Sequence, residues 1–463
     1  MSEPKLHGAS FRDPAGHIFE ENGRLKRLVT RHGREDYRQL ISSGLHARLC
    51  QENLLIPHTE ENSSPSWPPE TEAVLLPEVI PFVSYPYEWC FGQLKDAALL
   101  TLRVQELAMK HGMGLKDASA FNVQFRGARP VFIDTLSFQA DPGGPWPGYS
   151  QFCRHFLGPL LLGRYLWPHA GSFFRIALDG LPLEWVSRAL PWSTYFRFGC
   201  LIHIHWHARS QRAGSRAGAM PAAPNSAVAR DPKGPLVSSL RAMVEGLDPA
   251  ATAEPSAWSS YYNQSHHYSP SAETAKRAAV TNALQHIQPQ LVYDLGANTG
   301  VYSRLAAERG SYCVSFDADP ACVQANYRQS RREGSTNLLP LVMDLSDPSP
   351  QLGFAGAERM GLEARPQADL LLALALIHHL RITANAPLAR IAEYLASLGR
   401  ALLIEWVPKQ DPKVKELLRS RPDTFHDYHQ PGFLDAFARY FDTELTTPLP
   451  DSGRVVYLLR RRG

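Results

Sequence analysis

The sequence lacks the features of a membrane-spanning protein and of a disulfide-rich secreted one. No apolar run approaches the roughly 18 residues that a membrane-spanning helix needs. The first residues, MSEPKLH, contain no apolar core of a signal peptide. The six cysteines form no C-x-x-C pair, which argues against both a zinc cluster and a disulfide framework. These absences predict a protein of the reducing cytoplasm without a membrane span.

The sequence also lacks a large excess of charge of one sign. Its formal net charge is +3 over 463 residues. From Trp258 onward, 22 Lys and Arg stand against 21 Asp and Glu. A domain that binds a polyphosphate chain usually carries a clear basic excess. Nucleic acid is therefore a disfavoured substrate of the C-terminal half.

Composition divides the chain into two halves. Residues 208–235 are rich in Ala, Gly, Pro, Ser and Arg and show no sustained apolar period. Such a composition is typical of a flexible linker. It predicts an N-terminal α+β domain over residues 1–207 and a C-terminal domain over residues 236–463 that begins with a helical extension. The sequence does not indicate the oligomeric state.

The most specific motif is a glycine turn that follows a short apolar strand at residues 291–293. The turn reads Asp294-Leu-Gly296-Ala-Asn298-Thr-Gly300. Its glycines allow a sharp bend and let a ligand lie against bare main chain. Asparagine tolerates left-handed backbone better than other non-glycine residues, so Asn298 suits the same turn. A helix predicted to begin near Val301 would present unpaired N–H groups there. The pattern predicts a nucleotide-type cofactor site.

Further strand patterns follow the turn and alternate with helix patterns. They lie at residues 312–316, 341–345, 369–376, 401–405 and 454–459, and the last is expected to be an edge strand. Asp317 ends the first of them, where a carboxylate can accept both ribose hydroxyls of an adenosine. Asp344 lies in the second, and the third leads into His378 and His379. The alternation predicts an α/β domain with a doubly wound parallel sheet.

This order of elements resembles the class I S-adenosylmethionine-dependent methyltransferases over roughly residues 258–463. The resemblance implies a Rossmann-like sheet of seven strands, the last antiparallel, and S-adenosyl-L-methionine as cofactor. It implies that the turn, with Asp294, Gly296, Asn298 and Gly300, holds the methionine end of the cofactor. In the commonest family version a glycine stands where this chain has Asn298.

The same resemblance gives roles to the groups after the next strands. Asp317 is expected to hold the ribose, and Asp344 to face the adenine. His378 and His379 are expected to reach the reacting methyl. One of these imidazoles could take a proton from a substrate hydroxyl, because the ordinary histidine pKa lies near operating pH. The alternative is that they only shape the cofactor pocket.

The N-terminal half carries a different spacing. Asp117 and Asn122 are five positions apart, and Asp134 follows after the apolar residues 131–133. This resembles the protein-kinase and aminoglycoside-phosphotransferase fold, and it implies a kinase-like domain that binds Mg-ATP. Asp117 would then be the base, and Asn122 and Asp134 the metal ligands. No glycine-rich loop precedes these residues, so the alternative is that they are turn and cap residues of another fold.

Three functions follow from the two halves. The first is a methyltransferase that acts on an O or N atom of a small-molecule or glycan acceptor. The second is a non-catalytic binding protein that joins a degenerate kinase fold to a cofactor-binding methyltransferase fold, and the third is a bifunctional small-molecule kinase–methyltransferase. The whole order is also weakly similar to a rhizobial nodulation host-specificity protein with a methyltransferase half, which implies a small-molecule or surface-glycan context. The three acids Asp294, Asp317 and Asp344 favour the first function.

Overall fold

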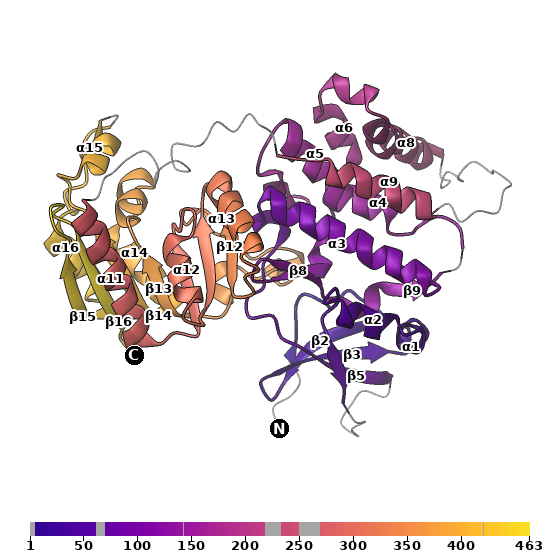
Figure 1. Ribbon diagram of the computed structural model, residues 1–463, viewed down its shortest axis with the longest axis horizontal. Coiled ribbons are helices and arrows are strands. Elements are labelled where there is room, and N and C mark those ends of the chain that lie inside the picture. The colour runs from indigo at the N-terminus through magenta and orange to yellow at the C-terminus, as the bar shows by residue number, and fades with distance from the viewer. Residues whose placement is uncertain (1–4, 62–69, 142, 218–232, 250–268, 420) are drawn as a thin grey trace. The chain divides into compact units, whose positions relative to one another are not determined.

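The computed structural model describes residues 5–61, 70–141, 143–217, 233–249, 269–419 and 421–463. Contacts divide the chain into two compact units (Figure 1). Unit 1 comprises Met1–Phe125, Pro130–Thr252 and Gln351–Arg359, and unit 2 comprises Arg126–Arg129, Ala253–Pro350 and Met360–Gly463. Each unit is built on a β-sheet of its own. None of the described helices is long and apolar enough to cross a membrane.

Unit 2 contains a seven-stranded sheet with the order β12-β11-β10-β13-β14-β16-β15. The strands are β10 (Leu291–Leu295), β11 (Tyr312–Asp317), β12 (Leu338–Val342), β13 (Ala368–Ala373), β14 (Gly399–Trp406), β15 (Phe441–Pro448) and β16 (Val455–Arg461). The strands from β12 to β14 are parallel, and β16 is antiparallel to both of its neighbours. The predicted α/β fold class, with a seven-stranded doubly wound sheet and an antiparallel last strand, is confirmed.

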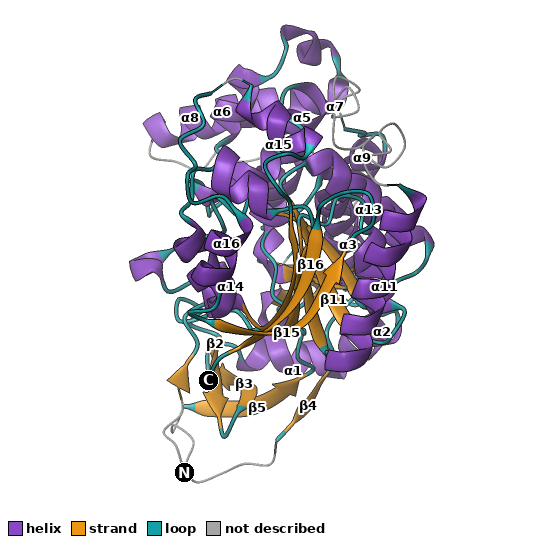
Figure 2. Ribbon diagram, turned by 90° about the vertical axis from the view of Figure 1, so that its left-hand side faces the viewer, coloured by secondary structure: helices purple, strands orange, loops and turns teal. Residues whose placement is uncertain are grey.

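Helices cover both faces of this sheet (Figures 1 and 2). They are α11 (Pro270–Ile287), α12 (Val301–Ala307), α13 (Pro320–Arg332), α14 (Leu388–Leu398), α15 (Pro412–Leu418) and α16 (Gln430–Phe437). On one face, Val280 of α11 shares a buried core with Leu370 and Leu372 of β13. Leu371, between them, points to the other face and is fully buried too. Burial on both faces is what a parallel sheet requires, and α14 packs against β13 and β14.

The position of the last strand is a correction to the sequence analysis. Residues 454–459 are expected at the edge of the sheet, but β16 pairs with β14 on one side and with β15 on the other. The edge strand β15 reads FDTELTTP, and most of its residues are exposed. Because an edge strand with two polar faces shows no apolar alternation, its sequence does not predict it.

Unit 1 begins with a five-stranded antiparallel sheet in the order β1-β2-β3-β5-β4 (Figure 2). The strands are β1 (Lys5–Leu6), β2 (Gly16–Glu21), β3 (Arg24–Thr30), β4 (His58–Glu60) and β5 (Thr71–Pro77). Asn22 and Gly23 connect β2 to β3 with φ angles of 52° and 72°. Positive φ at both positions is the requirement of a tight type I′ hairpin, which the Asn-Gly pair predicts.

The rest of unit 1 is mainly helical. Its longer helices are α1 (Arg34–Ser42), α2 (Leu45–Gln51), α3 (Phe91–Lys110), α5 (Gly158–Tyr165), α6 (Leu183–Ala189), α8 (His207–Ala217) and α9 (Lys233–Glu245). Short strands β6 (Met113–Leu115), β7 (Val123–Arg126), β8 (Arg129–Phe132) and β9 (Phe138–Ala140) follow α3. The α+β character expected of the N-terminal half is present, and its relation to kinases stays a prediction.

The ends of the predicted linker, residues 208–235, are helical. Residues 208–217 lie in α8, and α9 begins at Lys233; residues 218–232 lie outside the described residues. The helix α9 contacts α3 within unit 1, where Lys95 Nζ donates to the main-chain oxygens of Glu245 at 2.8 Å and Leu247 at 2.7 Å. The domain limits 1–207 and 236–463 stay a prediction.

Candidate functional site: a cavity in unit 2

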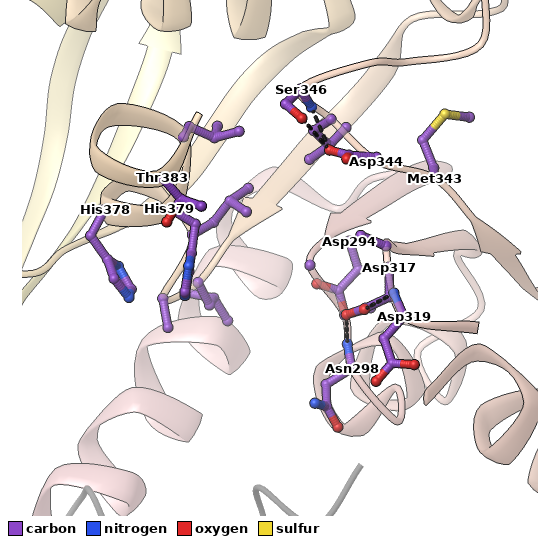
Figure 3. A pocket seen from close by; sticks show the side chains of 18 of the residues that line it. Asp294, Asn298, Asp317, Asp319, Met343, Asp344, Ser346, His378, His379 and Thr383 are labelled. Carbon is purple, nitrogen blue, oxygen red and sulfur yellow. Dashed lines mark hydrogen bonds between the residues drawn. The ribbon is translucent and has the colours of Figure 1, made fainter. Parts of the chain in front are cut away.

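A cavity of about 470 Å³ lies at the carboxyl ends of strands β10 to β13 (Figure 3). Ligands of open α/β sheets bind at this edge, and the volume lies in the usual range for small-molecule sites. Most of the predicted site residues line it, namely Asp294, Gly296, Asn298, Asp317, Asp344, His378 and His379. The structure therefore brings together groups that are spread over 86 positions of the sequence, from 294 to 379.

The glycine turn adopts the conformation that its sequence predicts. Gly296, Asn298 and Gly300 have φ angles of 76°, 51° and 80°. Gly300 does not line the cavity but precedes the first residue of α12. A Cβ at Gly300 would collide with the side chain of Asn326 on α13. The turn therefore requires glycine there both for its left-handed backbone and for the close approach of α13.

Asp317 ties the turn to the end of β11. Its Oδ2 accepts the Asn298 N–H at 2.7 Å, and its Oδ1 accepts the Asp319 N–H at 2.9 Å (Figure 3). Burial raises the pKa of Asp317 to about 6, although the two N–H bonds act in the opposite direction. A carboxylate has about four lone-pair sites, so both oxygens keep accepting capacity toward the cavity.

Asp294, at the end of β10, is a fully buried carboxylate. Its Oδ2 accepts the Ser303 hydroxyl of α12 at 2.6 Å. Burial raises the pKa of Asp294 to about 6, and the nearby Asp317 acts in the same direction. Two acids with raised pKa values at the edge of one cavity are typical of a functional site.

Asp344 lies beyond the end of its strand, because β12 ends at Val342 and not at the acid. The side chain is exposed, and its Oδ1 accepts the Ser346 N–H at 2.8 Å and the Ser346 hydroxyl at 2.6 Å. Asp344 and Ser346 both line the cavity (Figure 3). Asp344, which is predicted to face the adenine, thus lies in a loop, and its two hydrogen bonds from Ser346 fix its side chain.

His378 and His379 lie on the other side of the cavity from Asp294 and Asp317 (Figure 3). Their ring centroids are 4.2 Å apart. Burial lowers the pKa of His378 well below 6.5, and it lowers the pKa of His379 to about 4. The expectation of an imidazole pKa near operating pH is therefore wrong. Both rings are neutral at pH 7, and Nδ1 of the buried His378 has no hydrogen-bond partner among the described residues.

The sequence analysis missed a buried charge network beside the histidines. Lys276 of α11 lines the cavity and pairs with Glu405 at the end of β14, Nζ to Oε2 at 2.8 Å. Arg454 pairs with the same Glu405 at 3.1 Å and with Asp411 at 2.7 Å. Glu405 Oε2 also accepts the N–H of Ala375 at 2.9 Å. Helical periodicity along α11 does not show that one lysine points inward.

Ala375 adds a sign of local strain to this part of the cavity. It is a non-glycine residue with a φ angle of 52°, in the loop between β13 and His378. Such backbone costs an alanine about 1–2 kcal/mol, so the surrounding contacts must hold it. Strained backbone of this kind concentrates at functional sites.

The predicted metal ligands Asn122 and Asp134 lie in unit 1. Asn122 Nδ2 donates to Ser137 Oγ at 3.0 Å, and Ser137 Oγ donates to Asp134 Oδ2 at 2.5 Å. Asp134 Oδ1 pairs with the Arg27 guanidinium at 2.6 Å. Because Arg27 already neutralises Asp134, the arrangement does not favour a bound cation. In the described parts of the chain no group of three or more His, Cys, Asp and Glu could hold a metal ion.

Comparison with known proteins decides the family. No family model matches the chain. The nodulation protein NoeA of Rhizobium meliloti (strain 1021) is 31% identical over 472 residues, which cover 99% of this chain and 96% of NoeA. The chain belongs to the NoeA family. The identity extends over both units, so the N-terminal half is part of the family as much as the methyltransferase-like half.

Solved structures are similar to part of the chain only. Magnesium protoporphyrin IX methyltransferase (ChlM) from Synechocystis PCC 6803 is 18% identical, covers 41% of this chain and 84% of its own, and has a TM-score of 0.30. N-methyltransferase NodS from Bradyrhizobium japonicum WM9 is 10% identical, covers 42% of this chain and 97% of its own, and has a TM-score of 0.30. WbdD is 16% identical, covers 45% of this chain and 43% of its own, and has a TM-score of 0.32. At these scores the fold assignment rests on the strand order of unit 2.

Proposed function

We propose that this NoeA-family chain is a cytoplasmic S-adenosylmethionine-dependent methyltransferase that acts on an O or N atom of a small-molecule or glycan acceptor. The observation that carries the proposal is the half-buried carboxylate of Asp317. It accepts N–H groups from the glycine turn and from Asp319, and it keeps accepting capacity beside a cavity of about 470 Å³. Such a group suits a ligand that offers paired hydroxyls, as ribose does.

The cavity lining fits S-adenosyl-L-methionine. A Cβ at Gly296 would approach only Leu376, at 3.4 Å, so this stretch of main chain is open to a ligand. Asp294 and the glycine turn would hold the methionine end, Asp317 the ribose, and Asp344 the adenine side. When it is bound, the cofactor supplies a methyl group on a sulfonium centre together with its leaving group.

The histidines are assigned to the acceptor side of the cavity. Both rings are neutral at pH 7, so each has one nitrogen that can accept a hydrogen bond from an acceptor hydroxyl or amine. Burial also makes both rings weak bases. Orientation of the acceptor is therefore their main contribution, and proton removal is secondary unless the acceptor is itself acidic.

The two alternatives make different claims. A non-catalytic binding protein would bind the cofactor without transferring its methyl group. The paired acids at the turn and the neutral histidines across the cavity favour catalysis over this reading. A bifunctional kinase–methyltransferase is disfavoured by the Arg27–Asp134 ion pair, which occupies the carboxylate that Mg²⁺ would need.

Calorimetric titration with S-adenosylmethionine and S-adenosylhomocysteine tests the cofactor assignment. Asp317→Ala should weaken binding by about 2–4 kcal/mol, or about 30- to 1000-fold, because two charge-assisted hydrogen bonds are lost. Asp442→Ala is the matched control, since Asp442 is a surface carboxylate of the same unit that pairs with Arg462. Unchanged affinity of a folded Asp317→Ala variant would refute the assignment.

Turnover is tested with a cofactor that carries a labelled methyl group. The purified chain is incubated with small-molecule and glycan fractions of a cell extract, and label in a product is measured. We expect label transfer that His378→Gln and His379→Gln reduce while cofactor affinity stays unchanged. Tight cofactor binding without transfer to any fraction would favour the binding-protein alternative.

A further inference from the structure

Large apolar side chains are exposed mainly in one part of unit 1. Among the described residues, 10 of 16 exposed large hydrophobics lie between positions 166 and 206. We call them the aromatic face, and they are Leu166, Trp167, Phe173, Ile176, Trp185, Trp192, Tyr195, Phe196, Phe198 and Trp206. A concentration of exposed apolar side chains in one region usually marks a binding site, so this part of unit 1 is a candidate docking surface.

The part of the aromatic face from Trp185 onward comes from elements that contact one another. Trp185 lies on α6, Trp192 and Phe196 on η6 (Trp192–Phe196), Phe198 on α7 (Phe198–Cys200) and Trp206 on η7 (Leu201–Trp206). The segment η7 contacts α6, η6 and α7, and Figure 1 shows α5, α6 and α8 grouped together. The rings of Trp192 and Phe196 are 5.4 Å apart and are 75% and 78% exposed. These rings thus stand side by side in solvent.

Arginines outnumber acids in the segment of the chain that carries the aromatic face. Between positions 164 and 212 the sequence has six arginines and two acids. Glu184, one of the two acids, pairs with Arg188 on the next turn of α6 and with Arg212 on α8. Arg197 lies over the ring of Tyr165 at 5.7 Å. The segment that carries the exposed rings therefore has a net positive charge.

We propose that the aromatic face binds the surface of a membrane that contains anionic lipids. Trp and other aromatic side chains favour the depth of lipid headgroups, and aliphatic side chains such as Leu166 and Ile176 favour the acyl boundary. Arginines add attraction to negative headgroups. The chain would lie on the membrane, because no described helix is suited to cross it. This inference goes beyond the methyltransferase proposal and does not depend on it.

Two other occupants fit less well. A second copy that paired through the same face would bring two positive surfaces together, because a two-fold interface uses the same patch twice. A single-stranded nucleic acid would use the rings and the arginines. It would leave exposed the aliphatic Leu166 and Ile176, which are 49% and 75% accessible.

The test is flotation of the full chain with vesicles. One vesicle set is phosphatidylcholine alone, and in the other phosphatidylglycerol replaces part of it. We expect binding to the anionic vesicles, less to the neutral ones, and a decrease with salt. The double variant Trp192→Ser/Phe196→Ser should lower the partition coefficient about tenfold or more, and each of Arg175→Gln and Arg197→Gln about fivefold on anionic vesicles.

Phe354→Ser is the matched control, because Phe354 is 66% exposed and lies outside the aromatic face. It should bind vesicles as the unchanged chain does, and the cofactor affinity and melting temperature of every variant should match those of the unchanged chain. Absence of vesicle binding would overturn the proposal. In that case, loss of self-association in the Trp192→Ser/Phe196→Ser variant, measured by sedimentation, would identify a second copy as the occupant. Loss of oligonucleotide binding in the same variant would identify a single-stranded nucleic acid.

Discussion

The protonation state of Asp317 should make cofactor binding depend on pH. Burial raises the pKa of Asp317 to about 6, so the folded, ligand-free chain holds the protonated acid below about pH 6. A carboxylate that accepts hydroxyl hydrogen bonds must instead be ionised. We therefore expect the affinity for S-adenosylmethionine to fall by about tenfold per pH unit below about pH 6. Calorimetric titration on both sides of this pH measures it, and an affinity that does not change would contradict the role of Asp317.

The contribution of Asp317 to the stability of the ligand-free chain should change with pH in the direction opposite to that of cofactor affinity. A raised acid pKa contributes stability that is complete below the unfolded value of 3.8 and is lost as pH rises through about 6. The shift corresponds to about 3 kcal/mol as an order of magnitude. The difference in melting temperature between the unchanged chain and Asp317→Asn, followed across this range, isolates the contribution. Asp442→Asn, on the surface, is the control.

The two cavity histidines should not titrate near neutral pH. Burial lowers the pKa of His379 to about 4, and it lowers the pKa of His378 well below the ordinary value of 6.5. We expect the C2 proton resonances of both rings to stay at their neutral positions as pH falls from 8 through the ordinary value of 6.5. Nuclear magnetic resonance measures this, with His378→Gln and His379→Gln to assign the signals. A midpoint near 6.5 for either ring would restore that histidine as a general base of ordinary strength.

At the scale of elements, the turn between β10 and α12 depends on glycine for two separate reasons. Gly310, in a turn after α12, has a φ angle of 90° and open space around its Cβ position, so Gly310→Ala should cost only the backbone term of about 1–2 kcal/mol. Gly300→Ala adds the collision with Asn326, which should cost a further 1–3 kcal/mol, roughly. Denaturant unfolding of both variants measures the difference. Equal costs would show that α13 yields to the new methyl group.

The elements that the sequence predicts are those with a strong apolar pattern. The buried strands β10, β11 and β13 and the glycine turn follow from local runs and from backbone requirements, and these suffice to place Asp294, Asp317 and His378 at one edge of the sheet. Two features depend instead on tertiary contacts. The strand β15 is polar on both faces, and the inward direction of Lys276 depends on Glu405, which lies 129 positions later in the chain. No local period encodes either of them.

At the scale of the whole molecule, the cavity proposed for the cofactor belongs to unit 2 alone. All of its lining residues lie between Glu273 and Lys413, and every strand of the seven-stranded sheet lies between Leu291 and Arg461. The relation to NoeA nevertheless covers both units. The N-terminal half therefore contributes something other than the proposed cofactor site. Binding of a membrane surface by the aromatic face, as proposed above, is one such contribution.

A fragment of residues 253–463 should therefore bind S-adenosylmethionine about as tightly as the full chain, within roughly threefold, because no lining group is removed. The fragment retains residues 351–359 of unit 1, and it lacks residues 126–129 of unit 2, where the Gly127 N–H donates to Tyr312 Oη at 3.2 Å. Loss of this bond at a buried phenol should lower stability by about 1–3 kcal/mol without changing the cavity. Calorimetry and thermal unfolding of the fragment measure the two effects separately, and the same fragment with Asp317→Ala shows whether binding is at the cavity. A folded fragment that binds the cofactor more than tenfold less tightly would show that unit 1 shapes the site.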